Sequence, residues 1–159
     1  MMNDPNVKIA GRNASDIDAL VELRLAYLNE DTGGLTEGQT TRITAQLYKY
    51  LEEHLHRDMS AYFYVDENGR PLSTVFLVRL EKPANVHFEN GKTAYLMNVF
   101  TYEDYRGRGY ASAILEVLLE DARQEGITCI DVSSTPMGRA LYMKNGFTPR
   151  INTEMRIEL

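Results

Sequence analysis

Apolar positions recur along this chain with two different periods, and the period predicts which segments are helices and which are strands. After a short strand at 7–10, apolar residues recur every three or four positions, which is typical of helices that cover a core. Ser15 can cap the first helix, residues 29–35 interrupt it, and the pair Thr36 and Gln39 forms a capping box for the second. The apolar faces of the two helices comprise Ile17, Leu20, Val21, Leu25, Leu28, Ile43, Leu47, Tyr50, Leu51 and Leu55.

From Ala61 onward the period shortens to that of strands. Residues 61–65 and 73–80 flank a turn that contains Asn68 and Gly69, a pair favoured in tight hairpins. A second Asn-Gly pair precedes an apolar stretch at 93–101. These segments therefore predict three antiparallel strands in succession.

The second half of the chain returns to mixed periods. Residues 109–124 form an amphipathic helix that Gly126 can close, and 127–133 read as a buried strand. A strand, a helix and a strand in that order place 93–101 and 127–133 parallel. A further helix runs from Pro136 to Gly146, and alternation over 153–159 predicts a final strand. We expect an α/β fold in one domain, 1–159, with a mixed and mostly antiparallel sheet flanked by about four helices.

Composition and charge narrow the classes of function. The 159 residues are 43% hydrophobic and 25% charged, which suits a globular domain. The net charge of −6 disfavours nonspecific nucleic-acid binding and is compatible with a cationic substrate. Neither a membrane span nor a secretory signal is evident, so we expect a cytoplasmic protein. Cys129 is the single cysteine and lies in an apolar run, so we expect an inert interior thiol and no metal site.

The segment 106–111, Arg106-Gly107-Arg108-Gly109-Tyr110-Ala111, has the layout of an anion site. Its glycines permit backbone conformations that a side chain disfavours, and the first turn of the following helix presents unpaired N–H groups. A diphosphate fits such a turn. Dinucleotide binding is the competing interpretation, because Gly107, Gly109 and Ser112 imitate that fingerprint and Asp131 ends the next strand. The hairpins upstream and the short chain after Asp131 count against a doubly wound sheet.

A second motif, Leu141-Tyr142-x-Lys144-x-Gly146-Phe147, follows within 140–147. Together with the first motif, which matches an Arg/Gln-x-x-Gly-x-Gly/Ala signature, it resembles the GNAT superfamily of acyl-CoA-dependent N-acyltransferases. The order of the predicted elements also resembles the family fold over nearly the whole chain. The first third is matched only by the order of its elements.

This resemblance implies a binding mode for acetyl-CoA. The diphosphate of coenzyme A lies on the backbone amides of Arg106 to Ala111, and the pantetheine arm pairs with Val99, Phe100 and Thr101 where two parallel strands splay apart. The same backbone is expected to polarise the thioester carbonyl. Arg106 and Arg108 either reach phosphate or remain solvated loop charges.

The resemblance also assigns chemistry to Tyr142, which matches the family's common general acid for the departing thiolate. Many members carry a glutamate on the strand before the glycine motif, whereas 95–100 contains no carboxylate here. The remaining candidates for the base are Glu103, Asp104, a water held by Asn98 or Tyr95, and an acceptor that arrives already partly neutral.

The function that follows is acetyl transfer from acetyl-CoA to a primary amine by direct attack in a ternary complex. The acceptor is a small-molecule or peptide amine, selected by loops near 29–40 and 83–92. A non-catalytic acyl-CoA-binding module is the alternative, since the strand lacks the usual carboxylate. A homodimer is compatible with the resemblance, although no segment establishes one.

Overall fold

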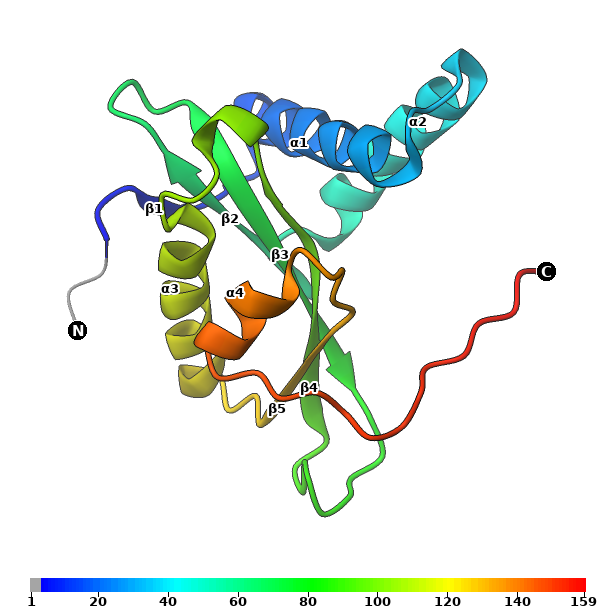
Figure 1. Ribbon diagram of the computed structural model, residues 1–159, viewed down its shortest axis with the longest axis vertical. Helices are drawn as coiled ribbons and strands as arrows, with labels where there is room; N and C mark the ends of the chain where they lie inside the picture. Colours follow the sequence, from blue (N-terminus) through cyan, green and yellow to red (C-terminus); the bar gives the residue numbers. More distant parts are fainter. Residues whose placement is uncertain (1–3) are drawn as a thin grey trace.

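A computed structural model describes residues 4–159, which form a five-stranded sheet between two layers of helices (Figure 1). The strands lie in chain order: β1 (Val7–Ile9), β2 (Met59–Val65), β3 (Pro71–Glu81), β4 (Lys92–Thr101) and β5 (Cys129–Val132). Neighbours are antiparallel except β4 and β5, which are parallel. The expected mixed sheet is therefore confirmed.

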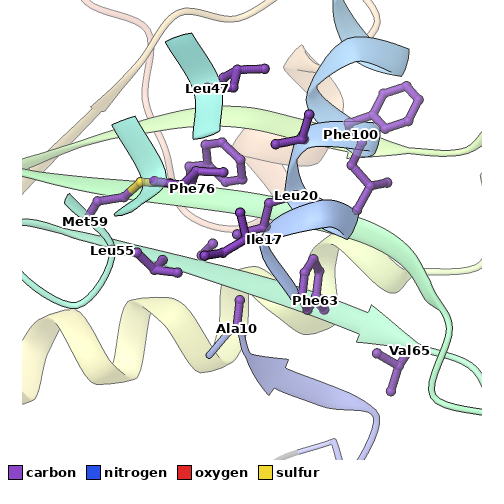
Figure 2. Packing of buried hydrophobic residues seen from close by; sticks show 14 residues of the cluster. Ala10, Ile17, Leu20, Leu47, Leu55, Met59, Phe63, Val65, Phe76 and Phe100 are labelled. Atoms are coloured by element: carbon purple, nitrogen blue, oxygen red, sulfur yellow. The ribbon is translucent and has the colours of Figure 1, made fainter. Parts of the chain in front are cut away.

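Helices α1 (Ala14–Thr32) and α2 (Glu37–His54) cover one face of the sheet, where the labelled side chains of Figure 2 pack. This cluster takes alternate residues of β2, Ala61, Phe63 and Val65, because successive strand residues point to opposite faces. Phe76 and Phe100 join it from β3 and β4, and Leu20 and Leu47 from the two helices.

The opposite face is covered by α3 (Tyr110–Gln124) and α4 (Arg139–Lys144). Ile114, Leu115 and Leu118 of α3 are fully buried there, against the other residues of the same strands. The long helix is amphipathic, as its sequence pattern predicts, and Gly126 follows it with a φ of 78°. A short 3-10 turn, η1 (Glu103–Tyr105), separates β4 from the glycine segment.

Several boundaries differ from the sequence-based expectations, and the three largest changes at helix ends have local causes. The first helix begins after Asn13, whose side chain accepts a hydrogen bond from the Asp16 amide, so Asn13 and not Ser15 is the cap. It continues to Thr32, since the residues from Asn29 to Thr32 remain helical before Gly33 ends it. The last helix begins at Arg139, because Thr135 caps the preceding turn by accepting from the Gly138 amide.

The predicted final strand at 153–159 is wrong. These residues are extended and exposed, and they lie beside no other strand. Alternation of apolar and polar residues forms a strand only where a neighbouring strand is available for pairing. Here the outer edge of β5 is unpaired, and residues 153–159 do not pair with it. No helix within residues 4–159 is long and apolar enough to cross a membrane.

Candidate functional site

The two parallel strands, β4 and the edge strand β5, separate part-way along β4. Their pairing runs from Thr93 opposite Cys129 to Leu96 opposite Val132 and then stops, while β4 continues to Thr101. A bulge follows at once, since Asn98 has a φ of 51° and the register against β3 shifts between Thr74 and Phe76. The edge of β4 beyond Leu96, which includes Val99, Phe100 and Thr101, therefore has no partner on the β5 side.

The glycine segment forms a tight turn directly after η1. Gly107 and Gly109 have φ values of 73° and 85°, and a Cβ built on either would meet no atom within 4 Å. The space around them is open, so it is the left-handed backbone and not crowding that requires glycine. The turn delivers the chain into the first turn of α3.

This turn leaves a run of backbone donors free. Among residues 4–159, the N–H groups from Gly107 to Ser112 have no hydrogen-bond acceptor, and the next bond is from Ala113 to the Gly109 carbonyl. Gly109, the N-cap of α3, supplies no side-chain cap. The segment that the sequence predicts for the diphosphate is thus a row of free donors at the positive end of a 15-residue helix.

The two arginines of the motif are held by the protein itself. Arg106 pairs with Glu30 of α1 at 2.6 Å and donates from Nε to the Thr101 carbonyl at 2.9 Å. Arg108 donates to the Asp104 carbonyl at 3.0 Å and lies over the Tyr105 ring. Both side chains stabilise the approach to the turn, and the backbone amides remain its free donors.

Tyr142 lies in α4, on the same face of the sheet as α3, and is 8% exposed. Its ring packs edge-on against Phe147, with centroids 5.7 Å apart. Burial, with smaller contributions from Tyr27 and Tyr95, raises the pKa of Tyr142 to about 12. The phenol is therefore protonated throughout the neutral range and lies near two other phenols.

Sequence reasoning missed that α1 contributes Arg24 and Tyr27 to the region near Tyr142. Arg24 lies over the Tyr27 ring, 5.4 Å from its centroid, and its Nη1 donates to Asn98 Oδ1 across a long 3.5 Å contact. Tyr27 packs edge-on against Phe100. Arg24, Tyr27 and Asp31 recur at helical spacing on α1, and this shared stripe was the available signal.

The candidate bases divide into two groups. Tyr95 and Asn98 belong to the strand at the splay, and Asn98 is buried at 4% exposure. Glu103 and Asp104 are exposed in η1, beyond the end of β4. The two residues expected to hold a water therefore lie on the strand at the splay, and the two carboxylates lie in an exposed turn.

Cys129 differs from the interior residue that its apolar run predicts. It is partly exposed because β5 is an edge strand, and it lies at the opposite end of the parallel pairing from the splay. Burial, and to a smaller extent Asp131, raises the pKa of its thiol, which disfavours the thiolate.

A cavity of about 760 Å³ adjoins Tyr142, between the end of β5, α4 and segment 147–154. Within residues 4–159, no cluster of three or more His, Cys, Asp and Glu side chains is arranged to hold a metal ion.

Comparisons with known proteins agree with this geometry. The model of the acetyltransferase (GNAT) family matches residues 24–147, a span that includes the splay, the glycine turn and Tyr142. No curated protein sequence matches the chain. Dinucleotide binding of the expected type requires a doubly wound sheet, and the observed sheet is not doubly wound.

Solved structures show the same fold. A predicted acetyltransferase from Clostridium acetobutylicum, determined with acetyl-CoA, is 26% identical with a TM-score of 0.79, covering 97% of this chain and 94% of that one. A GCN5-related N-acetyltransferase from Ralstonia eutropha is 20% identical with a TM-score of 0.78, covering 95% and 98%. Glucosamine-6-phosphate N-acetyltransferase from Arabidopsis thaliana is 16% identical with a TM-score of 0.67, covering 95% and 97%.

Proposed function

The chain belongs to the acetyltransferase (GNAT) family, and from that premise we propose that it transfers the acetyl group of acetyl-CoA to a primary amine by direct attack in a ternary complex. The observation that carries the proposal is the row of free amides from Gly107 to Ser112 beside the unpaired edge of β4. One element suits a diphosphate and the other suits an extended amide chain.

Magnitudes decide how acetyl-CoA is held. A helix terminus contributes about 0.3 to 2 kcal/mol toward an anion, whereas micromolar affinity requires about 8 kcal/mol. The dipole is therefore insufficient, and directed bonds from several amides supply the remainder together with contacts along β4. Because Arg106 and Arg108 are already engaged within the protein, backbone donors carry the phosphate recognition.

Acetyl-CoA supplies an activated thioester, and the residues around the splay organise its reaction. The amine nitrogen forms a bond to the thioester carbonyl carbon, the carbon–sulfur bond breaks, and coenzyme A leaves as a thiolate that takes up one proton. We assign the polarisation of the carbonyl to the backbone of Val99 to Thr101. We assign to Tyr142 a hydrogen bond to the departing sulfur.

The pKa of Tyr142 indicates how it acts. A phenol with a pKa of about 12 is a much weaker acid than a thiol with a pKa near 8.5, so complete proton transfer to the thiolate is uphill. A hydrogen bond from the neutral phenol stabilises the developing negative charge without that cost. We assign Tyr142 this role.

Direct attack agrees with the position of the only cysteine. Cys129 lies at the far end of the parallel pairing and has a raised pKa, so it is poorly suited to accept an acyl group. The incoming ammonium must still lose one proton. Asp31 is the carboxylate whose negative charge acts on the side chains beside the splay, since it raises the pKa of both Tyr27 and Arg24.

Two measurements test this function. Acetyl-CoA at about 100 times its Kd stabilises a protein by about 2.7 kcal/mol, which is a rise in Tm of about 5 to 10 °C for a domain of this size. NAD at the same concentration serves as the control and should give no rise. Release of free thiol is then followed across a panel of amines. Stabilisation without amine-dependent release identifies an acyl-CoA-binding module, and the absence of stabilisation contradicts the proposal.

A further inference from the structure

The cluster beside the splay contains hydrogen-bond donors that the protein does not use. Five arginines pair with carboxylates, namely Arg57, Arg79, Arg106, Arg123 and Arg150. Arg24 is partly buried yet pairs with no carboxylate in residues 4–159, and its one polar contact is the long bond to Asn98. Withdrawing a guanidinium from water without an anionic partner is unfavourable.

Asn98 adds a second unused donor. Its Oδ1 accepts from Arg24, which fixes the orientation of the amide, because the reverse orientation would place two donors face to face. Its Nδ2 is then buried without an acceptor. Thr74 Oγ1, on the neighbouring strand at the same bulge, also lacks a partner. In the part of the chain that the structure describes, these are the only buried side-chain polar atoms without one.

Unsatisfied buried polar groups are rare in folded proteins and call for a partner. Asn98 lies at the bulge where the two parallel strands separate, and Arg24 reaches it from α1, which covers that side of the sheet. Burial lowers the pKa of Arg24, but a guanidinium remains charged at neutral pH. What the site lacks is therefore an oxygen acceptor that carries negative charge.

We infer that the amine acceptor carries an acidic group, a carboxylate or a phosphate, whose oxygens pair with Arg24 beside Asn98. This inference rests on the proposed function, because it places the acceptor at the splay. An anionic oxygen satisfies the guanidinium through charge-assisted hydrogen bonds and can also accept from the Asn98 amide. Asp31, about two helical turns along the same stripe of α1, is available to the ammonium of the same molecule.

The test compares amines that differ only in the acidic group. Each α-amino acid is assayed against its amide and its decarboxylated amine, and an amino sugar is assayed with and without a phosphate. Charge-assisted bonds predict a kcat/KM at least about tenfold higher for the acidic member of a pair. The two arms identify whether carboxylate or phosphate is recognised.

Variants connect the preference to the residues. Arg24→Gln should reduce the preference at least about tenfold, mainly by raising KM for acidic acceptors, while the stabilisation by acetyl-CoA persists. Asn98→Asp supplies Arg24 with an internal carboxylate and should reduce the preference in the same direction. Arg123→Gln removes an exposed arginine from α3 and is the matched control, with the preference retained.

The outcomes separate the inference from the function on which it rests. Thiol release with neutral amines in preference to their acidic counterparts overturns the inference and leaves acetyl transfer intact. An Arg24→Gln variant that slows all amines equally also overturns it, because a structural role would act that way. If acetyl-CoA stabilises the protein but none of the amines causes thiol release, both the proposed function and the inference are wrong.

Discussion

At the scale of single residues, the phenol of Tyr142 is the group whose removal should affect the reaction most selectively. Tyr142→Phe keeps the ring that packs on Phe147 and removes only the hydroxyl. Losing one hydrogen bond to a developing charge should lower kcat by about 10- to 100-fold. The measurements are steady-state kinetics and titration with acetyl-CoA, whose Kd should change little.

Tyr48→Phe is the matched control for that change. Its hydroxyl donates to Asp18 at 2.7 Å on the exposed surface between α1 and α2, so turnover should be unaffected. Equal turnover in the wild type and Tyr142→Phe would remove the phenol from the mechanism. A parallel loss of acetyl-CoA affinity would instead indicate a binding role.

The residues that sequence reasoning identified and those that it missed differ in a physical way. Gly107, Gly109 and Tyr142 belong to local motifs, because a turn and a helix terminus require residues at fixed spacing. Arg24 and Asn98 meet only after α1 packs across β4, and their contact spans 74 positions of sequence. A single buried asparagine in an apolar strand carries no periodic signal, so its pairing follows from tertiary structure alone.

At the scale of elements, the turn before α3 can be tested by adding one methyl group. Gly109→Ala places a side chain at a φ of 85° in open space, so the cost is backbone strain of about 1 to 2 kcal/mol. If the residue relaxes, the free amides are redirected. We expect Tm to fall by about 2 to 8 °C and acetyl-CoA affinity to fall about tenfold, measured by calorimetry.

The β2–β3 hairpin offers a control with the same strain and a different location. Gly69 has a φ of 79°, and an added Cβ there also meets no atom within 4 Å. Gly69→Ala should therefore lower Tm by a similar amount and leave acetyl-CoA binding unchanged. If both variants bound acetyl-CoA with wild-type affinity, the turn at Gly109 would not be the phosphate site.

The hydrophobic pattern predicts the helices and strands that bury one face. It predicts neither where these elements end nor whether the last segment forms a strand. The amphipathic helix predicted over 109–124 is α3, which buries one face, and the capping box of Thr36 and Gln39 is present. Asn13 and Ser15 are comparable caps in isolation, so local chemistry could not choose between them. Residues 153–159 alternate correctly but have no neighbour, since pairing depends on which edge is available.

At the scale of the whole molecule, several buried phenols connect stability to alkaline pH. Burial raises the pKa of Tyr62, and that of Tyr102 to about 12, as for Tyr142. In the unfolded chain these groups ionise near pH 10, so the folded state holds the protons more tightly. The stabilisation is complete below about pH 10 and is lost as pH rises from about 10 to 12.

Urea unfolding at pH 8, 10 and 11 measures this effect. Tyr62→Phe removes the hydroxyl that donates to Asp121 at 3.0 Å and should cost about 0.5 to 1.5 kcal/mol at pH 8. Above pH 10 the difference from wild type should narrow, because the variant has one fewer phenol to ionise. A difference that is constant across the three pH values would contradict the assignment.

The exposed C-terminal segment should pair two copies of the chain. Ile151, Met155, Ile157 and Leu159 are almost fully exposed, and the segment leads away from its own sheet (Figure 1). The outer edge of β5 has unpaired backbone groups. The ion pair between Arg150 and Asp131 of β5 connects the chain just before this segment to the same strand. Exchange of residues 153–159 onto the partner's β5 covers both features at once.

Light scattering after gel filtration should then give twice the mass of the single chain at micromolar concentration. Ile157→Glu places a charge on the apolar side of the segment and should shift the protein to monomer, whereas Glu158→Gln, on its polar side, should not. Deletion of 153–159 should also give a monomer, and because it leaves the amides of 107–112 in place it should retain acetyl-CoA binding. A wild-type protein that remains monomeric at tens of micromolar would show that the segment does not pair two copies of the chain.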